Sequence, residues 1–218
     1  MEKYDVTFKK KFGQNFLKDI NIVKKIVSTG GITGKSLVIE VGPGGAIMTR
    51  ELASVADNVL AYEIDNDLSD ELYKRLENCD NVDILFQDFL QADLINDVKN
   101  YNYDHLYFIS NVPYYITTPI ITKVIDEISP DKIVIMIQEE VADRIIASPK
   151  NKSYGVLSII CQIFGAPEKA IYVDRKMFTP VPNRFCNCLR TAGTHSSSAF
   201  LPFARSFTVK SFSFHVKS

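Results

Sequence analysis

The sequence has few cysteines and no long apolar run. Its four cysteines, Cys79, Cys161, Cys186 and Cys188, form no C-x-x-C pair and no metal-ligand cluster with the three histidines. No apolar run approaches the roughly 20 residues that a transmembrane helix needs. The first residues also lack the apolar core of a secretory signal. We therefore expect a cytoplasmic protein that binds neither a metal nor a membrane.

Acidic residues are missing from the end of the chain. All 26 Asp and Glu residues precede Asn183, whereas residues 183–218 contain Lys, Arg and many Ser. The net charge of −1 also hides a basic N-terminal arm, residues 1–18, which could meet phosphates or could simply be a solvated face. The sequence thus divides into one domain, residues 1–183, and an aberrant tail, residues 184–218, to which we assign no domain.

The 218 residues, of which 46% are hydrophobic and 23% charged, are enough for one globular domain with a sizeable core. Short apolar runs alternate with helical patterns along this domain. The expected strands are residues 36–41, 58–62, 82–86, 106–109, 132–137 and 170–173. This alternation predicts an α/β fold with a mostly parallel sheet and helices on both faces.

Polar residues and glycines follow successive strands of this sheet. A glycine loop, residues 42–46, comes after the first strand, and Glu63 ends the second strand about 20 residues later, the spacing of a ribose-binding acid. Asp88 follows the third strand and Asn111 the fourth. This row predicts a site for an adenosine-containing cofactor beside a second planar ligand. The alternative is an ordinary turn between strand and helix with surface acids.

The turn Asn111-Val112-Pro113-Tyr114 suits recognition of the amino group of a planar base. The Asn111 side-chain oxygen and a backbone carbonyl at Val112 or Pro113 can accept the two N–H bonds of an exocyclic amine. The proline fixes the turn and has no competing N–H, and the Tyr114 ring can stack on the base. A strand that simply ends in a proline turn is the alternative.

Seven motifs in this order resemble the ribosomal RNA adenine N6-dimethyltransferase family, and its bacterial small-subunit (16S) branch most closely. They lie in residues 12–17, 40–44, 63–65, 87–88, 111–119, 138–144 and 178–182. Each motif is weak evidence alone, but the combination is specific and spans residues 8–183.

The resemblance implies a Rossmann-like fold that binds S-adenosyl-L-methionine. The cofactor contacts of the family fall here on Asn15, Leu17, Gly42, Glu63, Asp88 and Asn111. The resemblance assigns base recognition and catalysis to Asn111, Pro113 and Tyr114, with Phe178 as a second stacking ring. It further implies two methyl transfers to the N6 amine of each of two adjacent adenosines near the 3′ end of 16S rRNA. The substrate is the 30S subunit or its precursor, and the enzyme is a monomer.

The chain departs from the family pattern at two places. Ala46 stands where the family usually has a further glycine, and we expect its methyl group to crowd the cofactor slightly. After Pro182 the family continues with a closing strand, Asn-Val-Asp-Ser-Ala-Ile-Val, whereas this chain reads Asn183-Arg-Phe-Cys-Asn-Cys188. Deleting two bases from codons for the family sequence gives Arg-Phe-Cys-Asn-Cys. We therefore hypothesise an out-of-frame tail, in which the closing strand and the C-terminal helical domain are missing; a genuine divergent tail is the alternative.

Three other functions remain open. A related methylase acts on a 23S rRNA adenine and confers antibiotic resistance, but residues 117–119 and 138–142 fit the small-subunit enzyme better. A nicotinamide dehydrogenase shares a glycine loop and an acid but has no use for the Asn111–Tyr114 turn. A non-catalytic ribosome-assembly binder is also possible, because the tail departs so strongly from the family.

Overall fold

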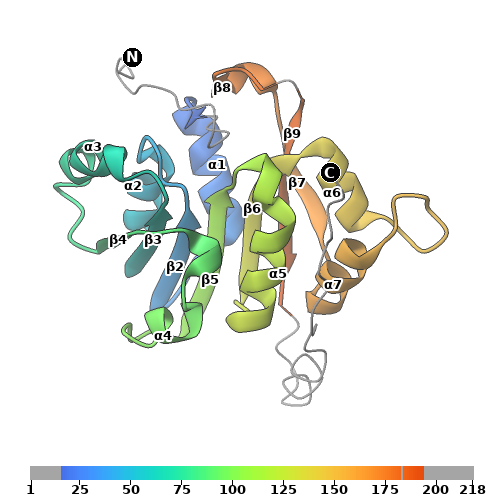
Figure 1. Ribbon diagram of the computed structural model, residues 1–218, viewed down its shortest axis with the longest axis horizontal. Coiled ribbons are helices and arrows are strands. Elements are labelled where there is room, and N and C mark those ends of the chain that lie inside the picture. Colours follow the sequence, from blue (N-terminus) through green and yellow to red (C-terminus); the bar gives the residue numbers. More distant parts are fainter. Residues whose placement is uncertain (1–15, 183, 194–218) are drawn as a thin grey trace, which may run out of the picture.

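The computed structural model describes residues 16–182 and 184–193 (Figure 1). Asn15 and the lysines at positions 9–11 of the basic arm lie outside the described residues, as does the end of the tail. Among the described helices, none is long and apolar enough to cross a membrane. Within the same part of the chain, no group of three or more His, Cys, Asp or Glu side chains is arranged to hold a metal ion.

A seven-stranded sheet in the order β4-β3-β2-β5-β6-β9-β7 forms the centre of the molecule. Its strands are β2 (Ser36–Val41), β3 (Asn58–Glu63), β4 (Val82–Phe86), β5 (His105–Asn111), β6 (Lys132–Gln138), β7 (Glu168–Val173) and β9 (Cys186–Ala192). The first five are parallel, and β9 runs antiparallel between β6 and β7. The structure confirms the predicted strands and the mostly parallel sheet. A separate antiparallel pair joins β1 (Phe16–Leu17) to β8 (Phe178–Thr179).

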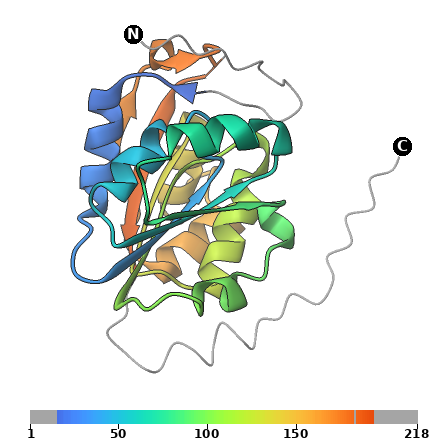
Figure 2. The same ribbon diagram turned by 90° about the vertical axis from the view of Figure 1, so that its left-hand side faces the viewer.

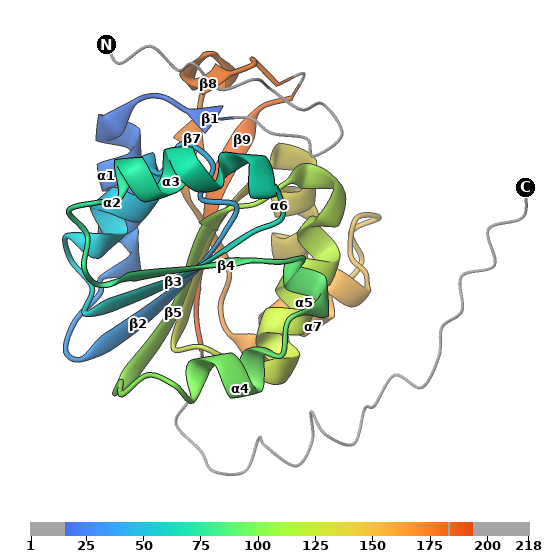
Figure 3. The same ribbon diagram turned by 60° about the vertical axis from the view of Figure 1, so that its left-hand side comes forward.

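Helices cover both faces of the sheet, as predicted (Figure 3). They are α1 (Ile20–Gly30), α2 (Ile47–Ala53), α3 (Ser69–Arg75), α4 (Leu94–Val98), α5 (Thr117–Glu127), α6 (Glu139–Ile146) and α7 (Val156–Phe164). One core cluster packs α1 and α2 against one face of the sheet, and another packs α4, α5, α6 and α7 against the opposite face. Figure 2 shows α1 and α4 on opposite sides of the strands. Asp19 caps the N-terminus of α1, because its side chain accepts a hydrogen bond from the backbone N–H of Asn21 at 2.8 Å.

The expectation that the closing strand is missing is wrong. Strand β9 pairs with β6 from Gln138↔Cys186 to Lys132↔Ala192 and with β7 on its other side. Its side chains alternate between the two faces of the sheet: Cys186 and Cys188 join the core on the α1 side, and Leu189 joins the core on the α5 side. Residues 186–192 can therefore form a strand despite their lack of acidic residues. The sheet is apolar on both faces between β6 and β7 and accepts small or aliphatic side chains there.

Candidate active site

A pocket lies at the carboxyl ends of β2, β3, β4 and β5, where parallel strands of an open sheet present their loops. Every cofactor residue expected from the sequence that falls in the described chain lines it: Leu17, Gly42, Glu63, Asp88 and Asn111. Pro113 and Tyr114 line the same pocket. The structure thus brings together the glycine loop, the strand-end acids and the Asn111–Tyr114 turn.

The glycine loop depends on left-handed backbone at two glycines. Gly42 has φ 73° and Gly44 has φ 51°, values that glycine adopts without steric cost. A Cβ added to Gly42 would meet no atom within 4 Å, so open space borders the backbone here. The Gly42 N–H donates to the Tyr62 carbonyl at 2.8 Å, which ties the loop to β3.

Ala46 does not crowd the pocket, contrary to the expectation from the sequence. Its side chain is fully buried against Leu68 and Leu72, beside α3, and it is not among the residues that line the pocket. Its backbone is left-handed, with φ 60°. The alanine therefore costs about 1 kcal/mol of backbone strain and takes no space from a ligand.

Glu63 lies at the end of β3 and is only 3% exposed. Its carboxylate accepts hydrogen bonds from the backbone N–H groups of Asp65 at 2.9 Å and Gly44 at 3.3 Å. Burial raises the pKa of Glu63, and these two N–H groups oppose that shift. The backbone thus holds the carboxylate in place at the pocket wall, where it can accept hydroxyl donors.

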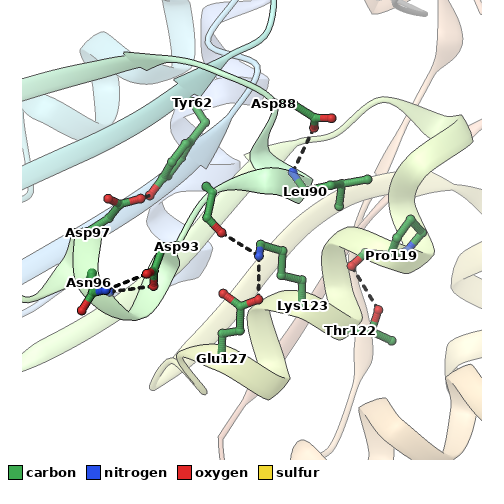
Figure 4. A network of polar contacts seen from close by, with 11 residues as sticks. Tyr62, Asp88, Leu90, Asp93, Asn96, Asp97, Pro119, Thr122, Lys123 and Glu127 are labelled. Atoms are coloured by element: carbon green, nitrogen blue, oxygen red, sulfur yellow. Dashed lines mark hydrogen bonds and ion pairs between the residues drawn. The ribbon is translucent and has the colours of Figure 1, made fainter. Parts of the chain in front are cut away.

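Asp88 is fixed at the end of β4 by local bonds (Figure 4). Its Oδ1 accepts from the Leu90 N–H at 2.9 Å, which caps a short 3₁₀ turn, Phe89–Gln91. Lys123 on α5 donates to the Ala92 carbonyl at 2.8 Å and to Glu127 at 2.6 Å, so α5 anchors the same turn. The acid is only partly buried and can accept from a ligand at the pocket edge.

Asn111 is the last residue of β5, and hydrogen bonds to the Pro113 carbonyl hold the turn that follows it. The Pro113 carbonyl accepts from the Ile116 N–H and from the Thr117 hydroxyl, both at 3.3 Å. Because the Pro113 carbonyl is engaged within the turn, the Val112 carbonyl is the better second acceptor for an amine. Pro113 then contributes by fixing the chain direction.

Tyr114 contacts a strand that the sequence did not predict. Its hydroxyl lies 2.9 Å from Cys186 Sγ, at the start of β9. Burial, and then the Cys186 contact, raise the pKa of Tyr114 well above its ordinary value. Tyr114 therefore stays neutral, and its ring is partly buried at the pocket wall between β5 and β9.

Phe178 is not available for stacking on a base. It is fully buried in the core on the α1 side, where β8 pairs it with Leu17. It is also absent from the residues that line the pocket. A ring with no exposed surface cannot stack on a ligand, so the assignment of Phe178 to base recognition is a correction to the sequence interpretation.

Two of the pocket residues that sequence reasoning did not assign, Tyr115 and Glu40, bear on its chemistry. Tyr115 is 59% exposed and lines the pocket beside Tyr114, which makes it a second ring at the rim. Glu40, on β2, lines the pocket from within and is only 1% exposed. The apolar strand around Glu40 was a signal for that residue, because a charged side chain inside a buried strand needs a reason to be there.

The charge of the pocket is one-sided. Glu63 and Asp88 line it together with Glu40, a buried acid whose pKa burial raises to about 8, and none of the described residues in its wall is Lys, Arg or His. Such a wall favours a ligand with positive charge and disfavours a pyrophosphate, which needs cations or a long helix N-terminus.

The comparisons with known proteins agree with this geometry. Residues 6–184 match the family described as Ribosomal RNA adenine dimethylase. A protein of Bacillus licheniformis called Ribosomal RNA small subunit methyltransferase A is 44% identical over 186 residues, which cover 84% of this chain and 64% of that protein. Its namesake in Aster yellows witches'-broom phytoplasma is 47% identical over 178 residues, covering 81% of this chain and 65% of that protein. The chain thus spans slightly less than two thirds of the length of these relatives.

Two solved structures share the fold. A dimethyladenosine transferase from Plasmodium falciparum has a TM-score of 0.73 and 26% identity, covering 87% of this chain and 68% of that chain. The 23S rRNA methyltransferase ErmE has a TM-score of 0.69 and 27% identity, covering 83% of this chain and 70% of that chain. Because the family match takes in nearly the whole described domain, this chain belongs to the ribosomal RNA adenine dimethylase family.

Proposed function

We propose that this chain transfers methyl groups from S-adenosyl-L-methionine to the N6 amine of adenosines in small-subunit (16S) ribosomal RNA. The observation that carries the proposal is the meeting of Asn111 and Tyr114 with the row of strand-end acids in one pocket. A carboxamide and a ring that can face a nucleobase thus stand beside a site suited to a cationic adenosine cofactor.

The residues of the pocket fit the parts of that cofactor in the order of the strands. Asp88, just after β4, can accept from the adenine amine, and Glu63, at the end of β3, can accept both ribose hydroxyls. Gly42, after β2, leaves space for close approach of the ligand, and Leu17 closes the pocket from the α1 side. The cofactor itself supplies an electrophilic methyl group on a sulfonium.

The protein's task is to position the amine and make its lone pair available. The N6 lone pair of adenine is delocalised into the ring, so the amine is a poor nucleophile. Hydrogen bonds from its two N–H groups to the Asn111 side-chain oxygen and the Val112 carbonyl favour a tetrahedral nitrogen with a localised lone pair. The same acceptors stabilise the positive charge that develops on nitrogen during attack.

The target base must leave its stack to reach this site. Tyr114 offers a ring at the pocket wall, and the exposed Tyr115 offers a second ring at the rim. Stacking on such rings compensates part of the cost of flipping a base out. Two rings beside the amine acceptors therefore suit an adenine in an RNA substrate.

A nicotinamide dehydrogenase fits this pocket poorly. The pyrophosphate of a dinucleotide carries two negative charges and would face Glu63 and Asp88 without a compensating cation in the described wall. The Asn111–Tyr114 turn would also have no role in hydride transfer.

We choose 16S over 23S RNA because the chain has higher sequence identity to the small-subunit enzymes. The relatives at 44% and 47% identity carry the small-subunit name, whereas the 23S enzyme is 27% identical. We place the reaction in the cytoplasm, on the 30S subunit or its precursor, with the protein acting as a monomer.

Labelled-methyl transfer to unmethylated 30S subunits, with 23S RNA as the competing substrate, tests the proposal. Wild type is expected to label 30S particles, and Asn111→Ala to lose about 10²–10³-fold in rate, because it removes one positioned acceptor. Asn96→Ala is the matched control, since Asn96 is an exposed residue of α4 whose side chain bonds to its near neighbours Asp93 and Lys99, away from the pocket lining. Equal transfer by wild type and Asn111→Ala would refute the catalytic assignment. Binding to 30S particles without transfer would point to the assembly binder instead.

A further inference from the structure

The pairing between β2 and β5 stops before either strand ends. The last paired residues are Ile39↔Phe108, although β2 continues to Val41 and β5 to Asn111. On their outer sides both strands stay paired as far as these last residues, β2 with β3 and β5 with β6. The sheet therefore separates between β2 and β5, at the edge where the pocket lies. Ligands of open α/β sheets bind at such points, where the order of the strands reverses.

The Ser110 hydroxyl bridges this gap. Its Oγ atom donates a hydrogen bond to the Val41 carbonyl at 2.8 Å and accepts one from the Val41 backbone N–H at 3.1 Å. The polar backbone groups of Val41 are thus paired with a side chain of β5 in place of its backbone. Ser110 is fully buried and Val41 is only 5% exposed, so removal of the hydroxyl would leave buried groups without this partner.

The two sides of the gap carry the two halves of the proposed reaction. On the β2 side, Val41 leads directly into the glycine loop at Gly42, whose N–H donates to the Tyr62 carbonyl on β3. On the β5 side, Ser110 directly precedes Asn111, which is paired with β6. Each half is therefore anchored to its own outer strand, and the Ser110 hydroxyl joins one half to the other.

We propose that Ser110 is a positioning residue that sets the distance between the methyl donor and the adenine amine. The inference rests on the proposed function, because it takes the cofactor to lie at the glycine loop and the base at Asn111. Transfer requires the reacting atoms to lie about 3–3.5 Å apart and in line. The hydrogen bonds of Ser110 hold the two strands together, and its side chain keeps their backbones from closing. Ser110 does not line the pocket, so it acts through its neighbours.

Ser158 offers a matched control in another part of the chain. It is also fully buried, and its Oγ atom accepts from the Gly155 N–H at 3.1 Å and donates to the Arg144 carbonyl at 2.5 Å. These bonds join α7 to α6, and none of the three residues lines the pocket. Ser158→Ala therefore loses the same two kinds of hydrogen bond as Ser110→Ala, but away from the gap between β2 and β5.

Single-turnover methyl transfer to unmethylated 30S subunits, at saturating cofactor and enzyme, measures the step that Ser110 would position. Ser110→Ala is expected to lower this rate about 10- to 100-fold, because a displacement of about 1 Å can cost that much. The dissociation constant of S-adenosylhomocysteine, measured by calorimetry, should stay close to the wild-type value, since β3 still anchors the glycine loop. Ser158→Ala should lose comparable stability in urea but keep the wild-type rate. Ser110→Thr keeps the hydroxyl and should recover most of the rate.

The outcomes separate this inference from the proposed function. Absence of methyl transfer by wild type would overturn both. Wild-type transfer with an unchanged rate in Ser110→Ala would overturn the role of Ser110 alone, as would equal losses of rate in Ser110→Ala and Ser158→Ala. A rate in Ser110→Thr as low as in Ser110→Ala would contradict the role of the hydroxyl.

A second variant covers the case in which Ser110→Ala does not fold. Ser110→Cys keeps a side chain of similar shape whose thiol makes only weak hydrogen bonds. It is expected to show a smaller loss of rate with unchanged cofactor binding. A wild-type rate in this variant, or a loss of rate that follows a loss of cofactor binding, would contradict the proposal.

Discussion

The two halves of the sheet contribute to the candidate site in different ways. The parallel half, β4-β3-β2-β5, carries the glycine loop, the three carboxyls and Asn111, and the pattern of its sequence predicts the strands that carry them. The antiparallel half, β6-β9-β7, includes a strand from the acid-free tail that the sequence did not predict. Even so, this half supplies Cys186, which contacts Tyr114. The difference shows that the pocket residues and the strands that pack against them come from separate parts of the sequence.

Both halves of the sheet contain buried polar atoms without a hydrogen-bond partner. In the parallel half, Glu40 Oε2 lacks a hydrogen bond at the pocket wall, where a ligand can supply one, and Thr49 Oγ1 on α2 lacks one outside the pocket lining. In the antiparallel half, Asn187 Nδ2 and Thr191 Oγ1 lack them on β9, where they face the apolar core on the α5 side. A ligand can therefore give Glu40 a partner, whereas the two atoms of β9 lie outside the pocket lining and cost stability without such compensation.

The largest expected effect tests the parallel half through pH. A folded-state pKa above the unfolded value means that the folded protein holds the Glu40 proton more tightly, so stability is full at low pH and falls as pH rises through about 8. We expect wild type without cofactor to lose a few kcal/mol of unfolding free energy between about pH 5 and pH 8 relative to Glu40→Gln. Urea unfolding across this range measures it. Parallel curves for the two proteins would mean that Glu40 is not buried as an acid.

The second effect concerns the cofactor side of the same half. Glu63→Gln replaces a carboxylate that can accept two ribose hydroxyls, and charge-assisted bonds of this kind are worth about 1.5–3 kcal/mol. We expect the dissociation constant for S-adenosylhomocysteine to rise roughly 10- to 100-fold by calorimetry. Glu77→Gln, an exposed acid after α3, is the control and should bind as wild type does. An unchanged constant in Glu63→Gln would remove the ribose assignment.

The third effect tests whether the antiparallel half contributes to activity through Tyr114 or contributes only to stability. Cys186 and Cys188 are both fully buried on the same face of β9, but only Cys186 touches Tyr114. Truncating either to alanine should cost about 1 kcal/mol of stability. Only Cys186→Ala is expected to lower kcat/KM for RNA, by about tenfold, since it frees the Tyr114 hydroxyl.

Cys186→Ser is the rescue for this comparison, because a hydroxyl can replace the thiol as a partner of Tyr114. Transfer assays and urea unfolding on the three variants separate activity from stability. Equal losses of activity in Cys186→Ala and Cys188→Ala would show that β9 acts by support alone.

The smallest effect tests the unpartnered atoms of β9. Thr191→Val exchanges a buried hydroxyl without a partner for a methyl group of the same shape, so it should stabilise the protein by about 1 kcal/mol. Thr122→Val is the control, since the exposed Thr122 hydroxyl bonds to the carbonyls of Thr118 and Pro119 and gains nothing by removal. Thermal unfolding of both variants gives the comparison. Destabilisation by Thr191→Val would mean that this hydroxyl is satisfied in solution.

The sequence specified the parallel half because its signals are local. A buried strand followed by a glycine loop or an acid can be recognised within a dozen residues, and Gly42, Glu63 and Asn111 were placed in this way. Burial of Phe178 could not be read from its own motif, because it results from pairing of β8 with β1 at the other end of the domain. Strand β9 was missed for a similar reason: its pairing partners, β6 and β7, decide its conformation, and composition does not.

The one-sided charge of the pocket also bears on how a reaction cycle would end. A sulfonium that has given away its methyl becomes a neutral thioether, so the spent molecule is one positive charge poorer than the fresh one. Walls lined by Glu40, Glu63 and Asp88 attract it less. In the proposed reaction, electrostatics thus favours the exchange of the spent cofactor for a new donor after each methyl transfer.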